Sequence, residues 1–407
     1  MKCRHCGAVL QHTFLDLGFA PPSNAYRLPA DLSKPEIYYP LRLKVCEQCW
    51  LVQTDDFTSA DQLFSADYAY FSSTSTSWLA HARGYVEKII PELSLDQHSF
   101  VVEVASNDGY LLRNFVSAGI PCLGVEPTAS TAEYAESIGV PVAREFFGEG
   151  FAEQLVQKNG MADLIIGNNV YAHVPDINDF TRGMAVALKP GGTITLEFPH
   201  LKNLIEKVQF DTVYHEHFSY LSLHAVDAIF KAAGLRIWKV EEIPTHGGSL
   251  RVFGCHQADT RQACDSVETV LQTEKLAGLL DMSVYLGFQK KVEAIKDRFV
   301  AFLIDQKAQG KSVLAYGAAA KGCTLLNFAG VKKDLLPMVA DAAPSKQGKF
   351  IPGCHIPIVS PAALADSVPD YLIIFPWNIA EEVMAQNQSL ATRGTRFVTF
   401  IPAMEVR

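Results

Sequence analysis

The sequence Ser99-Phe-Val-Val-Glu-Val-Ala-Ser-Asn-Asp-Gly109 indicates the fold of the central part of the chain. Its apolar run, residues 99–105, has the length of a buried strand, and a polar loop and a helical pattern over residues 110–118 follow it. A second unit of the same kind has its strand at 121–126 and its helix at 128–138. Strands that alternate with helices in this way are typical of an α/β fold.

The alternation continues beyond these two units. Strand patterns recur at residues 162–167 and 192–197, with a helix at about 177–188 between them. We therefore expect a parallel sheet covered by helices on both faces. A long helical region is expected at about 265–309. A strand is expected before it at residues 249–253, and further strands after it at 312–316, 336–341 and 371–375 predict a second α/β unit.

The N-terminal part of the chain, up to about residue 75, carries two Cys-x-x-Cys pairs, Cys3 with Cys6 and Cys46 with Cys49. Four thiolates can hold one tetrahedral Zn²⁺ in a closed structural site. This segment is rich in proline and aromatic residues and shows little periodicity, so a metal would help it to fold. The alternatives are a redox Cys-x-x-Cys, which normally begins a helix after a strand, and disulfides.

The bulk composition describes an ordered globular protein of two to three domains: 407 residues, 48% hydrophobic and 19% charged. A formal net charge of −9 argues against sequence-independent binding of nucleic acid, which needs a basic surface. No segment has the pattern of a signal peptide or the length of a membrane span. We expect a cytoplasmic protein with neither nucleic acid nor membrane as a partner.

The loops after the first two expected strands predict a cofactor site, because ligands of an open parallel sheet lie beyond the carboxyl ends of its strands. Glu126 ends the second strand, where a carboxylate can accept hydrogen bonds from both hydroxyls of a ribose. NAD would require Gly-x-Gly-x-x-Gly, but the first loop has only Gly109. Glu103 and Asp108 suit a cationic amino-acid tail, which favours S-adenosylmethionine. The alternative is an ordinary turn capped by Asn107 and Asp108.

A second candidate site is Tyr214-His-Glu-His217, a short segment with four proton-handling or hydrogen-bonding side chains. It does not match the metalloprotease pattern His-Glu-x-x-His, because Ser219 stands where the second histidine is required. Histidine is the usual general base near neutral pH, and a nearby carboxylate can orient it. His173 follows another expected strand and joins this candidate site. The alternative is that these histidines are structural.

Several further motifs occur in a fixed order along the chain. They are Tyr-x-Tyr before Ser72-Ser73, Glu-Val-x-x-Asn-Asp-Gly at 103–109, Val125-Glu-Pro127, Tyr-x-Glu-His at 214–217, His246-Gly-Gly248 and Tyr316-Gly-Ala-x-Ala-Lys321. Together with the cysteine pairs, they resemble the family of S-adenosylmethionine-dependent sugar C-methyltransferases, which act on nucleotide-linked 4-keto-6-deoxy sugars. The resemblance covers essentially the whole chain.

The resemblance implies three domains. They are a zinc-binding domain (1–75), a class I, Rossmann-like methyltransferase core (76–264) and a Rossmann-like α/β domain that holds much of the nucleotide (265–407). For the cofactor, the expected contacts are Glu103, Ala105, Asn107, Asp108, Gly109, Glu126, Pro127, Asn168 and Asn169. For the substrate, they are His246, Gly247, Lys321, Asp341 and Lys346. The loop at Gly317 would contact a phosphate of the nucleotide. The alternative is that its small residues only allow the strand and the following helix to pack closely.

The family mechanism assigns the base to the histidine of Tyr-x-Glu-His, which is His217 here. Tyr214, Glu216 and His173 would support the sugar, and Tyr68 or Tyr70 would reach in from the zinc domain. Because the variable position of the motif is His215, either His215 or His217 is a candidate for the base.

The expected chemistry follows from such a substrate. The ketone at carbon 4 acidifies the proton at carbon 3, and removal of that proton leaves an enolate. The enolate would attack the sulfonium methyl group of S-adenosylmethionine, which breaks the bond between sulfur and methyl and releases S-adenosylhomocysteine. We expect a monomer whose partner is a nucleotide-linked keto-sugar. Two other classes stay open: a zinc-stabilised binding protein without catalysis, and a methyltransferase acting on oxygen or nitrogen.

Overall fold

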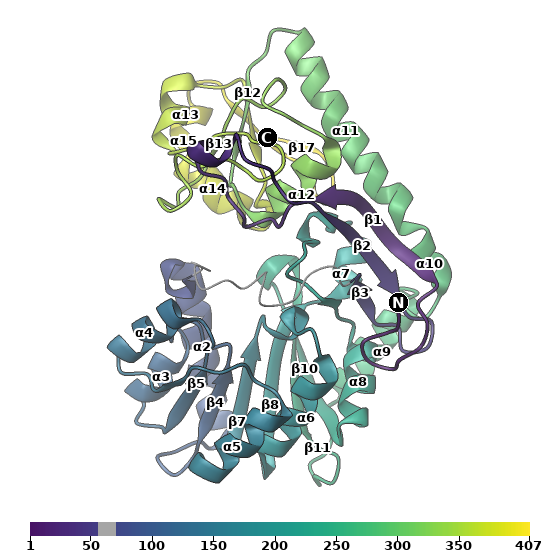
Figure 1. Cartoon of the computed structure of the whole chain (residues 1–407), viewed down its shortest axis with the longest axis vertical. Coiled ribbons are helices and arrows are strands. Elements are labelled where there is room, and N and C mark those ends of the chain that lie inside the picture. The colour runs from purple at the N-terminus through teal and green to yellow at the C-terminus, as the bar shows by residue number, and fades with distance from the viewer. Residues whose placement is uncertain (56–70) are drawn as a thin grey trace.

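The computed structural model describes residues 1–55 and 71–407. These residues form three sheets, of four, seven and six strands. The seven-stranded and the six-stranded sheets lie one beyond the other along the longest axis of the molecule, and strands β1 (His12–Ala20) and β2 (Tyr39–Val45) lie beside them on one side (Figure 1). Within the described ranges, no helix is both long and apolar enough to cross a membrane.

The seven-stranded sheet has the order β10-β11-β8-β7-β4-β5-β6. The strands from β4 to β8 pair in parallel, as the alternating pattern predicts. The expectation of a fully parallel sheet is wrong for β10 and β11, which pair antiparallel. Residues 244–248 join these two strands and are too few for a parallel crossover. The strands are β4 (Val101–Val104), β5 (Cys122–Val125), β6 (Val142–Ala143), β7 (Ala162–Asn168), β8 (Leu188–Pro199), β10 (Leu235–Ile243) and β11 (Ser249–His256).

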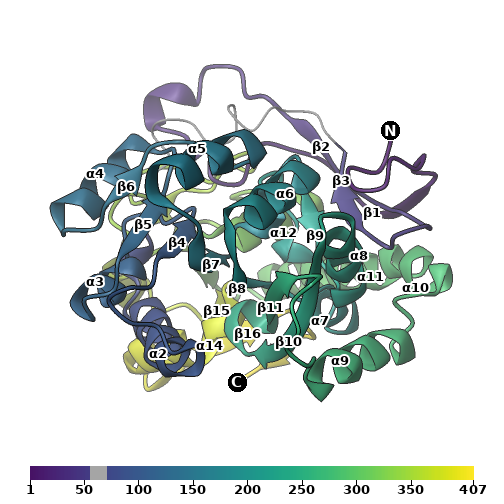
Figure 2. The same ribbon diagram turned by 90° about the horizontal axis from the view of Figure 1, so that it is seen from below.

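Helices cover both faces of this sheet (Figure 2). Alternate side chains of β4 point to opposite faces of the sheet. Val101 packs in the apolar cluster with α2 and α3, and Val102 packs in the cluster with α5, α6 and α8. Burial on both faces explains why these strands are continuously apolar. The helices are α2 (Thr76–Leu93), α3 (Leu112–Ser117), α4 (Ala129–Ser137), α5 (Glu149–Asn159), α6 (Ile177–Ala187), α7 (Leu201–Glu206), α8 (Leu223–Ala232) and α9 (Asp265–Leu276).

The four-stranded sheet has the order β1-β2-β3-β9. The N-terminal segment shows little periodicity in its sequence, but it contains β1, a strand of nine residues. This strand packs against the C-terminal part of the chain, where the rings of Phe14 and Phe288 stack at 4.7 Å. Strand β3 (Val52–Thr54) follows the second cysteine pair, and its partner β9 (Ser219–Tyr220) follows His217. The N-terminal sheet is therefore completed by the segment that carries the candidate base.

The six-stranded sheet has the order β14-β13-β12-β15-β16-β17. The long helical region before it is divided, because Gly278 has a φ of +83° and Asp281 caps a new helix. The strands are β12 (Val313–Tyr316), β13 (Val339–Ala340), β14 (Ile358–Val359), β15 (Tyr371–Ile374), β16 (Arg396–Thr399) and β17 (Glu405–Val406). The helices are α10 (Met282–Leu286), α11 (Phe288–Ala308), α12 (Ala320–Ala329), α13 (Ala362–Ser367), α14 (Ala380–Gln386) and α15 (Gln388–Ala391).

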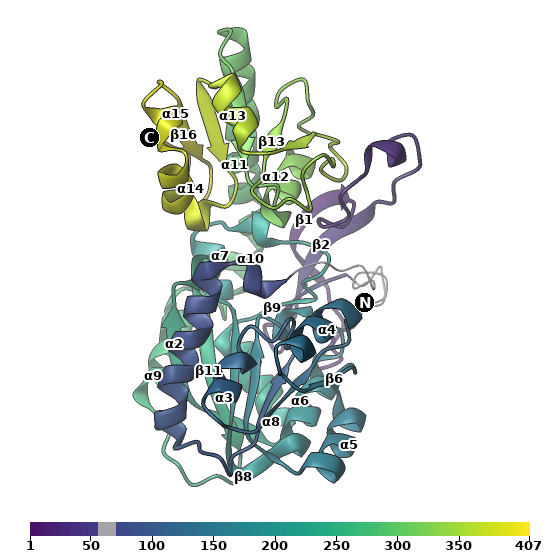
Figure 3. The same ribbon diagram turned by 90° about the vertical axis from the view of Figure 1, so that its left-hand side faces the viewer.

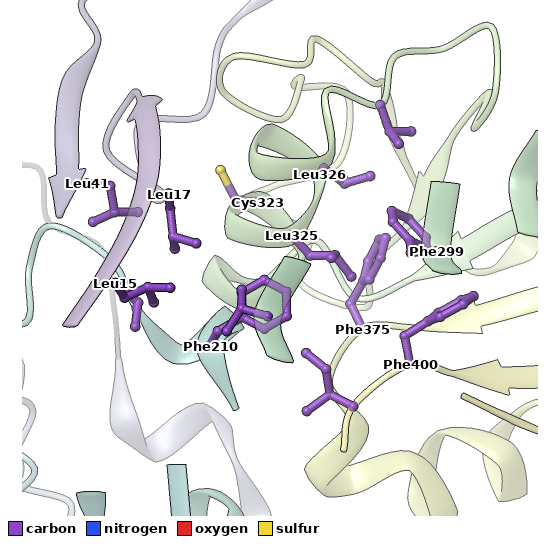
Figure 4. Close-up of a cluster of buried hydrophobic side chains, with 14 of the residues drawn as sticks. Leu15, Leu17, Leu41, Phe210, Phe299, Cys323, Leu325, Leu326, Phe375 and Phe400 are labelled. Carbon is purple, nitrogen blue, oxygen red and sulfur yellow. The ribbon is translucent and has the colours of Figure 1, made fainter. Parts of the chain in front are cut away.

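One apolar core joins the three parts of the molecule. It combines Leu15 of β1, Phe210 of the seven-stranded part, and Phe299 and Leu325 of the C-terminal helices (Figure 4). Figure 3 shows the resulting arrangement from the side, with the N-terminal strands beside the junction of the other two parts. The residues before His217 lie at this junction, so all three parts contribute to its surroundings.

Candidate active site

Two loops bring His173 and His217 together. His173 ends the 3-10 helix η3 (Tyr171–His173) after β7, and His217 lies between η4 (Phe210–Thr212) and β9. Their ring centroids are 4.5 Å apart, and the ring of Tyr214 lies 4.1 Å from that of His217. His173 Nδ1 lies 2.9 Å from the backbone oxygen of Glu216 and donates to it. Three of the expected catalytic side chains are thus in contact.

His215 lies on the other side of the same segment. Its Nε2 is 3.3 Å from the backbone oxygen of Tyr39, and its ring centroid is 6.0 Å from the Tyr39 ring. The two histidines of the motif therefore have different neighbours, and only His217 joins His173 and Tyr214. Tyr68 and Tyr70 lie outside the described residues.

Glu216 is buried and faces the N-terminal segment. Asn24 Nδ2 donates to its carboxylate at 3.1 Å and Ser23 Oγ at 3.4 Å. Burial raises the pKa of Glu216, while these hydrogen bonds oppose the rise. Sequence reasoning missed Ser23 and Asn24, because they lie in a proline-rich stretch that is far from Glu216 in the chain.

His246 adds a third histidine from the loop between β10 and β11. It has a φ of 53° within η5 (Thr245–Gly247), and Asn169, at the end of β7, also has a φ of 53°. Asn169 Nδ2 lies 3.3 Å from His246 Nε2. Left-handed backbone at residues other than glycine is costly and is concentrated at functional sites. The neighbouring Asn168 lies beside Asn169 at the same end of β7 and is buried.

Gly247 brings the C-terminal part of the chain to this loop. A Cβ at Gly247 would stand 2.4 Å from the ring of Trp377, in η6 (Trp377–Ile379). Trp377 Nε1 in turn donates to Asp211 Oδ2 at 2.8 Å. Burial raises the pKa of Asp211 to about 6, although the charge of Lys321 opposes the rise.

Lys321 lies in the first turn of α12, at the carboxyl end of β12. Its Nζ donates to Asn378 Oδ1 at 2.9 Å and lies 5.2 Å from the centre of the Trp377 ring. Burial lowers the pKa of His246 to about 4, and the charge of Lys321 contributes to the shift. Burial, His173, His246 and Lys321 together lower the pKa of His217 well below its usual value. Lys321 and the loop of His246 thus lie against the same Trp377 ring.

Asp341 directly follows β13, and Lys346 lies in the loop after it. Lys346 Nζ lies 3.4 Å from Asp341 Oδ2 and donates to the backbone oxygen of Ala318 at 3.1 Å. The pair therefore borders the loop at Gly317, where the sequence predicted contacts to the nucleotide. No histidine is among the hydrogen-bond partners that the structure gives for either side chain.

The expected cofactor loop follows β4. Glu103 is buried in that strand, and burial with the charges of Asp108 and Glu126 raises its pKa well above the usual value. Glu126 accepts hydrogen bonds from the backbone N–H groups of Asn107, at 3.0 Å, and Thr128, at 2.9 Å. The two expected strand ends are therefore connected. The loop uses left-handed backbone at Ala105, Asn107 and Gly109, and Pro127 follows at the end of β5.

The four N-terminal cysteines converge as predicted. Their sulfur atoms all lie within 4.8 Å of one another, with Cys3 Sγ 3.6 Å from Cys49 Sγ and Cys6 Sγ 3.5 Å from Cys46 Sγ. All four are free cysteines rather than disulfides.

Comparison with protein families divides the chain into three matches. A "Putative zinc binding domain" matches residues 3–64, a "Methyltransferase domain" matches 78–240, and a "C-methyltransferase C-terminal domain" matches 244–402. The C-methyltransferase NovU of Streptomyces niveus is 33% identical over 405 residues, which cover 100% of this chain and 96% of NovU.

The chain belongs to the C-methyltransferase family.

Other relatives match only part of this C-methyltransferase. An uncharacterized methyltransferase of Mycobacterium leprae (strain TN) is 30% identical over 106 residues, 24% of this chain and 36% of that protein. A crystal structure of an S-adenosylmethionine-dependent methyltransferase from Anabaena variabilis has 16% identity and a TM-score of 0.38, covering 49% of this chain and 96% of that one.

The cofactor of this C-methyltransferase is S-adenosylmethionine, and the residues of its class I fold suit that molecule. Glu103 Oε2 and Asp108 Oδ1 are buried and have no hydrogen-bond partner within residues 1–55 and 71–407. Buried carboxylate oxygens without partners are costly unless a ligand satisfies them, and a cationic amino-acid tail would do so. The N-terminal thiolates likewise fit a structural zinc ion, because four sulfur ligands complete a tetrahedral site.

A buried carboxylate that sequence reasoning missed supports the His246 loop of the C-methyltransferase. Glu197, at the end of β8, accepts hydrogen bonds from His81 at 2.9 Å, Arg251 at 2.9 Å and Thr245 Oγ1 at 3.0 Å. Thr245 directly precedes His246, so this network fixes the loop. Its members come from four separate elements, and no spacing in the sequence relates them.

Proposed function

We propose that this C-methyltransferase methylates carbon 3 of a nucleotide-linked 4-keto-6-deoxy sugar through an enolate. The observation that carries the proposal is His217, a buried imidazole in contact with His173 and Tyr214 near the ends of the central strands. Bound S-adenosylmethionine supplies an electrophilic methyl group. The protein must then supply a base, a place for the ketone and an environment without water.

His217 is suited to removing a proton. Burial, with a smaller contribution from the charge of Lys321, lowers its pKa, so the imidazole is neutral near pH 7 and can accept the proton of carbon 3. The same shift makes it a weaker base, so proton transfer also depends on stabilisation of the enolate. The different surroundings of His215, against Tyr39, favour His217 over His215 as the base. Tyr214, His173 and Glu216 would hold the sugar, with Tyr68 or Tyr70 as further candidates.

Lys321 is proposed to face the sugar. The resemblance suggested that Lys321 contacts a phosphate. However, the charge of Lys321 contributes to the lowered pKa values of both His217 and His246. Its ammonium group also lies over the ring of Trp377, on which Gly247 packs. An ammonium group there would stabilise the negative oxygen of an enolate. Asp341 and Lys346, farther along the C-terminal sheet, are the proposed contacts to the nucleotide.

The other assignments extend this proposal. Residues 1–75 would form the zinc-binding domain, 76–264 the methyltransferase domain and 265–407 the domain that binds the nucleotide sugar. Glu103, Asp108, Glu126, Asn168 and their neighbours would hold the cofactor. The protein would act as a cytoplasmic monomer in deoxysugar biosynthesis.

The test is incubation with S-adenosylmethionine and a panel of 4-keto-6-deoxy sugars linked to different nucleoside diphosphates, in deuterated water. We expect a mass increase of one methyl group on carbon, with NMR placing it at carbon 3. A ketone at carbon 4 also acidifies the proton at carbon 5. A methyl group at carbon 5 would therefore refute methylation at carbon 3 and still support a mechanism through an enolate. Methylation of oxygen or nitrogen would refute C-methylation of these sugars, and cofactor binding without turnover of any panel member would refute the proposed substrate class.

A further inference from the structure

Arg4 lies inside the first cysteine pair but is not a metal ligand. Its backbone N–H donates to Gln53 Oε1 at 2.9 Å. Its guanidinium donates to two backbone oxygens in separate segments, that of Pro175 at 2.7 Å from Nη1 and that of Thr54 at 3.2 Å from Nη2. One side chain therefore connects the zinc site with strand β3 and with the loop after β7.

Both segments that Arg4 holds lead directly to a histidine of the candidate active site. Pro175 is two residues beyond His173. Thr54 donates its N–H to the backbone oxygen of Phe218, the residue after His217, at 3.1 Å. The guanidinium also lies 5.3 Å from the centre of the Phe218 ring.

The two histidine loops are themselves joined at this point. Phe218 N–H donates to the backbone oxygen of Ala172 at 2.8 Å, and His173 Nδ1 donates to that of Glu216 at 2.9 Å. Arg4 binds a backbone oxygen next to each side of this junction, that of Pro175 and that of Thr54. Because a guanidinium holds its donors in a rigid plane, two carbonyl partners fix the separation of the two loops, whereas the single ammonium group of lysine is a point donor.

We propose that Arg4 is a positioning residue: it clamps the loops of His173 and His217 together and makes the zinc site the support of the active-site geometry. The cysteines hold the backbone on both sides of Arg4, and Gln53 strengthens the link by donating to Cys3 Sγ at 3.3 Å. The structural role of Arg4 does not depend on the proposed function, and only its expected effect on catalysis does.

The structural test compares Arg4→Met and Arg4→Lys with the control Arg42→Met. Arg42 lies on β2 of the same sheet and pairs with Asp16 at 2.9 Å. Hydrogen–deuterium exchange by mass spectrometry would follow residues 213–220 and 171–175. In Arg4→Met we expect amide exchange in these peptides to be about 10-fold faster, as expected when charged hydrogen bonds that hold a loop are lost. Arg4→Lys should be intermediate, and Arg42→Met should match the wild type.

Metal analysis separates the clamp from the zinc site, because all three variants keep the four cysteines and should retain one zinc ion per chain. If Arg4→Met folds poorly, Arg4→Lys decides. Unchanged protection of both peptides in a zinc-loaded Arg4→Lys or Arg4→Met protein would overturn the proposal.

The kinetic test uses exchange of the carbon-3 hydrogen of a 4-keto-6-deoxy nucleoside-diphosphate sugar with deuterated water. Small displacements of catalytic groups reduce rates by up to about 10²-fold, so Arg4→Met should lower kcat by 10- to 100-fold while KM and cofactor affinity stay near wild type. An equal loss in Arg42→Met would refute positioning by Arg4. If no sugar of the panel reacts, the proposed function is refuted. The amide exchange of residues 213–220 and 171–175 still tests whether Arg4 holds the two loops together.

Discussion

The N-terminal sheet and the C-terminal α/β part approach the same histidine loop from different sides and by different means. The N-terminal sheet pairs its backbone with the loop, through the β3–β9 ladder and the bond from Thr54 to Phe218. The C-terminal part contributes side chains: Thr324 Oγ1 donates to the backbone oxygen of Val213 at 2.8 Å, and Lys321 and Trp377 lie beside His246 and Asp211. The N-terminal sheet holds the loop mainly through backbone pairing, and the C-terminal part holds it through the hydrogen bond of Thr324 and sets the charge around it through Lys321.

This difference predicts different consequences for mutations. Backbone pairing depends on whether the N-terminal sheet is folded, and it is reinforced by the half-buried side chain of Arg4. The electrostatic effect of the C-terminal part depends on one ammonium group and leaves the fold largely intact. Changes in the N-terminal part should therefore lower stability and activity together, and changes at Lys321 should lower activity alone.

The largest effect is expected from Cys46→Ser, which removes one of four zinc ligands. Structural zinc contributes about 10–16 kcal/mol of binding free energy in small zinc-binding peptides, so loss of the ion should unfold the N-terminal sheet and release β9. Metal analysis should show less than one zinc per chain, and thermal unfolding should begin at a lower temperature. The control is Cys264→Ser, an exposed cysteine outside the cluster. Wild-type stability in the zinc-free protein would refute the claim that the zinc site supports the N-terminal sheet and the histidine loop.

His217→Asn should lower methyl transfer by about 10²–10⁴-fold, because a positioned general base is lost. Exchange of the carbon-3 hydrogen should fall with it, while S-adenosylmethionine still binds. The low pKa of His217 means that protonation begins only below the usual pH of about 6.5, so the wild-type rate should be retained below that pH and fall as the pH decreases further. His98→Asn, at an exposed position, is the control. If exchange of the carbon-3 hydrogen persists in His217→Asn and is lost in His215→Asn, His215 is the base.

Lys321→Met sharpens the comparison, because it removes the charge of the C-terminal part and leaves the N-terminal sheet untouched. Loss of one oxyanion-stabilising group typically costs about 10²–10³-fold in kcat. We expect a loss of that size, with zinc content and unfolding temperature as in the wild type. Lys333→Met, an exposed lysine in the same part of the chain, should behave as the wild type. A raised KM and weaker binding of nucleoside diphosphates, with kcat retained, would assign Lys321 to the phosphates instead.

Local patterns in the sequence predicted much of the fold and failed where distant segments meet. The strand before Asp108 follows from its local apolar pattern, and the convergence of the two distant cysteine pairs follows from the chemistry of a shared four-thiolate metal site. The pairing of β3 with β9 does not, because β9 has only two residues and its partner is far away in the chain. Ser23 and Arg4 were missed for the same reason, since their importance comes from Glu216, Pro175 and Thr54, which only the folded chain brings near.

The smallest effect is expected from Glu126→Ala, because Glu126 belongs to neither flanking region. Its carboxylate accepts backbone hydrogen bonds from Asn107 and Thr128, and we propose that it also accepts the ribose hydroxyls of the cofactor. Loss of such charge-assisted bonds should weaken binding of S-adenosylmethionine by about 1–3 kcal/mol in calorimetry. Glu133→Ala removes an exposed glutamate that pairs with Arg144 on the surface, and its affinity should equal that of the wild type. Zinc content and protection of residues 213–220 should be unchanged in both variants, because the hydrogen bonds of Glu126 go to the backbone of Asn107 and Thr128 and not to the histidine loop. Unchanged affinity in Glu126→Ala would remove the ribose assignment, and loss of protection at 213–220 would show that the cofactor loop also positions the base.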